Sequence, residues 1–81
     1  MKVRLASRAS HALQAAPPSV QKAFSKQISL LEINLRHPSL GAKKYDEAND
    51  LWQARVNRDW RFYFQIERGM IVVTSLRAHP K

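Results

Sequence analysis

The chain has 81 residues, which is enough for one domain with a single modest core and too few for two. Its 14 Lys and Arg against six Asp and Glu give a formal charge of +8, which favours a polyanionic partner: RNA, DNA, an anionic lipid surface or an acidic protein. The absence of cysteine excludes disulfides and Cys-ligated zinc, and no apolar run approaches the roughly 18 residues of a membrane span. The first residues also lack the apolar stretch of a secretory signal, so we expect one cytoplasmic domain over residues 1–81 with no membrane partner.

The first third of the chain predicts a strand and two helices. Lys2 to Ala6 alternates basic and apolar residues, as a half-buried strand does. Ser7 is a candidate cap for a first helix from about Arg8 to Ala15. Pro17-Pro18 ends that helix, because proline has no amide hydrogen and pushes the preceding residue towards extended conformations.

A second helix follows, with Ser19 as its candidate cap. Its apolar residues recur at spacings of three and four, which is typical of one buried helical face: Val20, Phe24, Ile28, Leu31 and Leu35. We expect His37-Pro38 to end it and Gly41 to support a turn. The segment from Ala42 to Asp50 is polar with no clear period, and it is predicted to be a loop.

The remainder is rich in aromatic and β-branched residues and predicts three consecutive strands. We expect them at Leu51 to Asn57, Asp59 to Glu67 and Met70 to His79, with turns at Arg58 and Arg68-Gly69. Because side chains alternate between the two faces of a strand, residue parity sorts them into two sets. The predicted core face carries Trp52, Ala54, Val56, Trp60, Phe62, Phe64, Ile66, Met70, Val72, Thr74 and Leu76. The opposite, open face carries Gln53, Arg55, Arg61, Tyr63, Gln65, Ser75, Arg77 and His79, and we expect the function to lie there.

The order of elements predicts an α+β fold. It is β-α-α-β-β-β, which indicates a mostly antiparallel twisted sheet with the helical hairpin packed on one face. The apolar stripe of the second helix would then meet the apolar parity of the strands.

Three features together resemble the RelE/ParE superfamily of bacterial toxins from type II toxin-antitoxin systems. They are the strand led by Trp52, the Trp60-Arg61 pair before Phe62-Tyr63-Phe64, and the Arg77-Ala78-His79 ending. The resemblance covers the whole chain. It implies a toxin held inactive by an acidic cognate antitoxin and, for the RelE-like branch, metal-independent cleavage of mRNA on the ribosome with no cofactor.

The resemblance also implies roles for individual residues. Arg61 matches an arginine that contacts the scissile phosphate, Arg77 a further phosphate contact, and His79 a histidine that acts as general acid. Arg55 falls where basic residues line the substrate groove. Apart from the resemblance, we expect Tyr63, Gln53 and Lys81 to bind substrate as well; Tyr63 could stack on a base or merely cover the sheet. The general base would have to be Asp46 or Glu47, in the loop before Trp52.

These residue types suit the chemistry. Arginine stays charged and can bind two phosphate oxygens at once, which offsets the charge that grows on a phosphate under attack. Histidine, with an ordinary pKa of about 6.5, can donate a proton to the leaving oxygen near neutral pH. The three scattered histidines have no matching carboxylates, so no metal site is expected.

Two other functions remain open at this point. A ParE-like inhibitor of DNA gyrase would have the same fold and no nuclease activity, although gyrase-directed members generally lack the catalytic face. A catalytically inactive relative that only binds RNA or the antitoxin is the other alternative.

Overall fold

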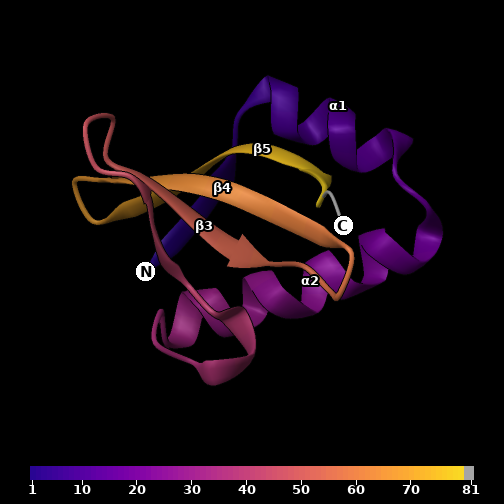
Figure 1. The fold of residues 1–81 in the computed structure, drawn as a ribbon, viewed down its shortest axis with the longest axis horizontal. Helices are drawn as coiled ribbons and strands as arrows, with labels where there is room; N and C mark the ends of the chain where they lie inside the picture. Colours follow the sequence, from indigo (N-terminus) through magenta and orange to yellow (C-terminus); the bar gives the residue numbers. More distant parts are fainter. Residues whose placement is uncertain (80–81) are drawn as a thin grey trace.

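The computed structural model describes residues 1–79 (Figure 1). Its elements, in chain order, are β1 (Lys2–Leu5), α1 (Ser7–Ala15), α2 (Pro18–Ile33), the 3-10 turn η1 (Pro38–Leu40), β2 (Lys43–Asp46), β3 (Leu51–Arg55), β4 (Trp60–Glu67) and β5 (Met70–Ala78). Within residues 1–79 no helix is long and apolar enough to cross a membrane. Lys81, predicted to line the groove, lies outside the described residues.

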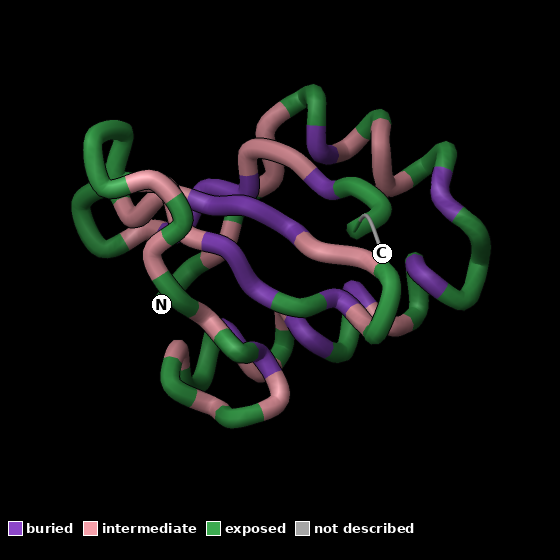
Figure 2. The backbone as a smooth tube through the Cα atoms, viewed as in Figure 1, coloured by how far each residue is buried: buried purple, intermediate pink, exposed green. Residues whose placement is uncertain are grey.

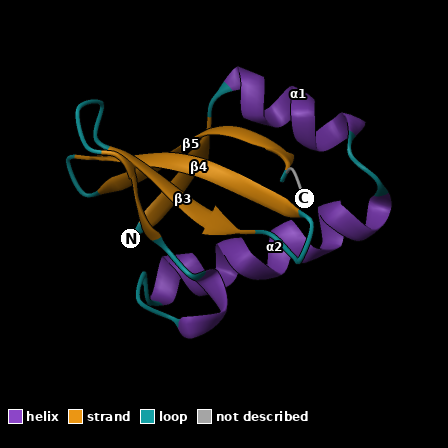
Figure 3. Cartoon of the chain, in the orientation of Figure 1, coloured by secondary structure: helices purple, strands orange, loops and turns teal. Residues whose placement is uncertain are grey.

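The strands form one sheet in the order β1-β5-β4-β3-β2. The edge strand β1 runs parallel to β5, and the other neighbouring pairs are antiparallel. Figure 3 shows no helix in front of β3, β4 and β5, so the two helices cover one face and leave the other uncovered. The predicted α+β fold is therefore confirmed.

The helix boundaries differ from the prediction because neither Ser7 nor Ser19 is a cap: Ala6 precedes α1, and a proline begins α2. Ser7 is already helical, and α2 begins at Pro18 with Pro17 before it; neither helix has a side-chain cap. Proline suits the first helical position, where its missing amide hydrogen would have had no partner in the helix. The helix α2 ends at Ile33, ahead of the expected His37-Pro38, and Leu35 packs against the core from the following loop.

The segment predicted to be a loop, Ala42 to Asp50, contains the edge strand β2. Lys43 pairs with Gln53 and Lys44 with Trp52, which places β2 antiparallel to β3. Its sequence, Lys-Lys-Tyr-Asp, shows no apolar alternation. Lysines are common on edge strands because they discourage pairing with other chains. Here the two lysines leave no alternation of apolar and polar residues by which the strand could be predicted from the sequence.

The predicted parity is correct for β3 and β4 and wrong for the first half of β5. Tyr63 pairs with Ser75 whereas Phe64 pairs with Val73, so Thr74 is an extra residue in a β-bulge. A bulge of one residue reverses which face the preceding side chains occupy. Ile71 and Val73 therefore join the core, where Met70, Val72 and Thr74 were expected.

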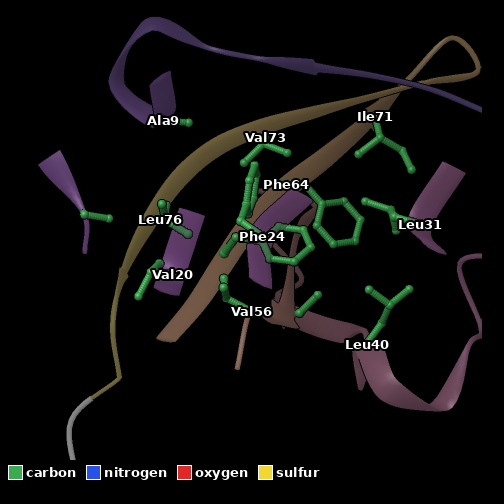
Figure 4. Close-up of a cluster of buried hydrophobic side chains, with 13 residues drawn as sticks. Ala9, Val20, Phe24, Leu31, Leu40, Val56, Phe64, Ile71, Val73 and Leu76 are labelled. Atoms are coloured by element: carbon green, nitrogen blue, oxygen red, sulfur yellow. The ribbon is translucent and has the colours of Figure 1, made fainter. Parts of the chain in front are cut away.

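The core lies between the helices and the covered face of the sheet (Figure 4). Phe24 of α2 meets Phe62 edge to face at 5.4 Å between ring centroids, and Trp52 stacks on Phe64 at 6.0 Å. In Figure 2 the buried residues run along the middle of the strands. The central strands are thus a rigid base for whatever their uncovered face carries.

Candidate functional site

Three arginines form a row across the uncovered face of the sheet. Arg55 of β3 lies directly opposite Arg61 of β4, and Arg61 lies opposite Arg77 of β5. Side chains of directly opposed residues share a face, with Cβ atoms roughly 5 Å apart. The structure therefore places three arginines from three neighbouring strands on one face of the sheet, as the parity of the sequence indicated.

Arg61, at the centre of this row, is fixed by the turn between β3 and β4. Its Nη1 donates hydrogen bonds to the carbonyl oxygens of Asn57 at 2.8 Å, Trp60 at 3.0 Å and Arg58 at 3.3 Å. Carbonyl oxygens hold the cation in place without neutralising its charge. The guanidinium is therefore positioned in advance for an anion, which is what electrostatic stabilisation of a reacting phosphate requires.

A first concavity, which we call the arginine hollow, has a volume of ≈ 180 Å³. It is lined by Gly41, Lys43, Gln53, Ala54, Arg55, Arg61 and His79, so among the described residues no carboxylate lines it. Gly41 has φ 54°, and a Cβ there would lie 3.3 Å from Nη2 of Arg55. The glycine thus satisfies a left-handed turn and leaves room for the Arg55 side chain.

A second concavity, the tyrosine hollow, has a volume of ≈ 380 Å³ and is lined by Tyr45, Gln53, Tyr63, Arg77, Ala78 and His79. Inside it the Arg77 guanidinium carbon lies 4.5 Å from the Tyr63 ring centroid, a cation–π contact. Gln53 Nε2 donates a hydrogen bond of 3.0 Å to the Tyr63 hydroxyl. Interaction with the Tyr63 side chain is the main cause that raises the pKa of Arg77 above its usual value, so Arg77 remains a cation.

His79 lines both hollows. Its imidazole is exposed, and its backbone amide donates a hydrogen bond of 2.7 Å to the Asp59 carbonyl oxygen. This bond holds the backbone of His79 beside the β3–β4 turn, the same turn that fixes Arg61. A residue that would otherwise belong to a frayed chain end is thereby held next to the arginines.

The two carboxylates considered as a general base, Asp46 and Glu47, line neither the arginine hollow nor the tyrosine hollow. Asp46 pairs with Leu51, four residues before Arg55, which is about 13 Å along a strand. Asp46 accepts hydrogen bonds from Asn49, of which the one from the side chain at 2.8 Å contributes most to lowering its pKa. Glu47 lies 3.8 Å from Lys44 Nζ. Asp46 is the last residue of β2 and Glu47 follows it, so both carboxylates lie at the end of β3 opposite to Arg55.

The sequence analysis did not assign Lys43 or Tyr45 to the site. Both belong to β2, which was expected to be a loop, so no parity could place them. Lys43 lines the arginine hollow beside Arg55 and Arg61, and Tyr45 lines the tyrosine hollow.

Gln27 of α2 ties the arginine hollow to the helical layer. Its side chain is 5% exposed, and its Nε2 donates to the carbonyl oxygens of Arg55 at 2.9 Å and Ser39 at 3.0 Å. A buried amide that satisfies two carbonyls in this way is costly to displace. It fixes the end of β3, and with it the backbone from which Arg55 projects.

Comparison with solved structures relates this arrangement to known proteins. The RelE-RelB complex of Pyrococcus horikoshii OT3 matches with a TM-score of 0.78 and 21% identity, over 95% of this chain and 92% of that one. The YoeB/ParE toxin of Agrobacterium tumefaciens matches with a TM-score of 0.80 and 13% identity, over 99% and 100% of the two chains. The toxin-antitoxin complex RelBE2 of Mycobacterium tuberculosis matches with a TM-score of 0.76 and 20% identity, over 99% and 92%.

Neither a protein-family model nor a curated protein sequence matches the chain. The likeness is therefore one of structure at low sequence identity. The chain has the fold of the RelE/ParE-superfamily toxins, over nearly its whole length, and the resemblance inferred from Trp60-Arg61 and Arg77-Ala78-His79 is confirmed at the level of that fold.

Proposed function

We propose that this chain is the toxin of a type II toxin-antitoxin system and that it cleaves mRNA, on the ribosome and without a metal. One observation carries the proposal: the row of Arg55, Arg61 and Arg77 ends beside His79 on a face that no helix covers. This set combines charges for a phosphate with a group that can move a proton. The structural neighbours include toxins in complex with RelB and related antitoxins, which supports the toxin assignment.

The proposed reaction is a transfer within the RNA. The 2′-hydroxyl gives its proton to solvent water and its oxygen attacks the adjacent phosphorus, the bond from phosphorus to the 5′-oxygen breaks, and His79 gives its proton to that 5′-oxygen. The products are a 2′,3′-cyclic phosphate and a 5′-hydroxyl. Arg61, with Arg55 and Arg77 on either side, stabilises the charge that develops on the phosphate oxygens. The carboxylates of Asp46 and Glu47, at the other end of the sheet, are given no part in these steps.

The proposal also includes the partners. A formal charge of +8 on 81 residues favours both ribosomal RNA and an acidic antitoxin, which would hold the toxin inactive until it is removed. Action on the ribosome places the protein in the cytoplasm.

The test is primer extension on a reporter mRNA after induction of the chain in bacteria. We expect discrete cuts within translated codons for the native chain, and none for Arg61→Ala. Arg36→Ala is the matched control, because Arg36 is exposed in the loop after α2 and lines neither hollow. It should cut like the native chain. Growth arrest without cuts, or cuts that persist in Arg61→Ala, would overturn the proposal.

A further inference from the structure

Tyr45 is a large aromatic residue that the fold leaves exposed on the cationic face. Its exposed fraction is 53%, although it lies within a strand. The pairing of β2 with β3 shifts between Lys44, opposite Trp52, and Asp46, opposite Leu51, so Tyr45 is the extra residue at an irregularity in the edge strand. Such bulges re-aim a side chain, and they are frequent beside functional sites.

The shift aims Tyr45 at Tyr63. The two ring centroids are 5.0 Å apart with an interplanar angle of 66°, an edge-to-face contact. Tyr63 is itself only 4% exposed, and its hydroxyl is held by Gln53. Tyr45 therefore rests against a ring that cannot move easily.

Arg77 adds a second flat group to the same hollow. Its guanidinium lies on the Tyr63 ring, while the side chain remains exposed. The tyrosine hollow is thus lined by the ring of Tyr45 and by a planar cation. Aromatic rings and arginine planes are the two groups on which unstacked nucleobases pack.

The tyrosine hollow adjoins the arginine hollow, since Gln53 and His79 line both. A phosphate held by Arg55 and Arg61 would leave the base of an adjoining nucleotide next to Tyr45. The two hollows together match the two parts of a nucleotide, one charged and one flat and apolar.

We infer that the tyrosine hollow is a nucleobase subsite, in which a base of single-stranded RNA that adjoins a phosphate in the arginine hollow stacks against Tyr45 and beside Arg77. The inference rests on the proposed function only in taking RNA as the ligand. It makes Tyr45 a residue that positions and selects the substrate, and gives it no part in bond cleavage.

The test measures binding alone, with fluorescently labelled oligonucleotides of 2′-O-methyl RNA that cannot be cleaved because the attacking hydroxyl is blocked. A second oligomer of the same length and charge carries abasic sugars in place of nucleosides. Fluorescence anisotropy at one fixed salt concentration gives the ratio of the two affinities, from which the shared phosphate contribution cancels.

We expect the native chain to prefer the base-bearing oligomer by about tenfold, within the range known for stacking of one base on one aromatic side chain. Tyr45→Ala should remove most of this preference and leave the affinity for the abasic oligomer unchanged. Tyr45→Phe should retain it, because the ring remains. Ile33→Ala, which removes another large exposed apolar side chain from the far end of α2, should also retain it.

Three results would overturn the inference: a native chain that does not distinguish the two oligomers, a Tyr45→Ala variant with the native preference, or one that loses affinity for both oligomers equally. Because the probe is not cleaved, the result is independent of the nuclease proposal. A base preference that depends on Tyr45 together with mRNA cuts that survive Arg61→Ala would reject the cleavage mechanism and keep the subsite.

Discussion

The two faces of the same three strands differ in almost every physical respect. On β4, Phe62 and Phe64 point to the helices and are 0% exposed, while Arg61 and Tyr63, which alternate with them along the strand, point to the uncovered side. The covered face is apolar and closely packed. The uncovered face gathers like charges. The comparison indicates that the covered face provides the stability of the fold; in the proposed function, the uncovered face provides the binding site.

Like charges placed directly opposite one another weaken a sheet. The row from Arg55 through Arg61 to Arg77 contains two such pairs. Three carbonyl oxygens around Arg61 and the ring of Tyr63 beneath Arg77 offset part of the repulsion. An anionic ligand would remove the rest, so the arrangement costs stability in the free protein and favours the bound state.

The largest effect on stability is expected for Phe64→Ala, on the covered face. Phe64 is fully buried and stacks on Trp52, so its removal should lower the free energy of unfolding by about 3–5 kcal/mol. Unfolding in urea measures this. Ile33→Ala, at a site 84% exposed, is the control and should change it by less than about 0.5 kcal/mol. A loss under about 1 kcal/mol for Phe64→Ala would mean that the covered face is not the main source of stability.

His79→Ala, on the uncovered face, should have the opposite effect to Phe64→Ala: it should lower activity and leave stability nearly unchanged. If His79 protonates the leaving oxygen, its loss should slow RNA cleavage by about 100-fold, the low end for general acid catalysis. The fold should be little affected, because the bond to the Asp59 carbonyl uses the backbone amide, which alanine keeps. Single-turnover cleavage assays measure the rate, and His11→Ala, on the exposed side of α1, is the control. Cleavage at the native rate by His79→Ala would remove the residue from the mechanism.

The smallest expected effect is a gain in stability for Arg55→Gln, and it tests the difference between the two faces most specifically. Arg55→Gln removes one charge from the row and should raise the free energy of unfolding by about 0.2–1 kcal/mol while weakening RNA binding. Thermal unfolding at low salt measures the gain, which should shrink as salt is added. Arg36→Gln, outside the row, should show no such gain. A lower unfolding temperature for Arg55→Gln would contradict the view that repulsion between the arginines of the uncovered face lowers the stability of the fold.

Much of the uncovered face was predictable from the sequence. The strands β3 and β4 are regular, so alternation alone places Arg55, Arg61 and Tyr63 together, and the residues after the bulge in β5 keep the parity that places Arg77 there. The first half of β5 was not predictable, since a bulge at Thr74 leaves no mark in a run of apolar residues.

The edge strand β2 is the other part of the site that the sequence did not predict. Residues Lys43–Asp46 are too polar to predict as a strand, so the position of Tyr45 depends on a register that only the folded sheet defines. The same register places Asp46 opposite Leu51 and therefore far from Arg55. The sequence shows only that Asp46 lies shortly before Trp52, which does not predict this separation. In both cases the missing information is tertiary pairing and not local propensity.

The central claim is that the uncovered face carries the activity without carrying the fold, and Arg61→Ala tests it most directly. One preparation should be used for both thermal unfolding and cleavage of ribosome-bound mRNA. The account predicts a variant that remains folded at the assay temperature, because the freed carbonyls of Asn57, part-buried, and Arg58, exposed, lie in a surface turn where they can bind water. It also predicts cleavage reduced by about 100-fold or more. Cleavage at the native rate by the folded variant would contradict the account.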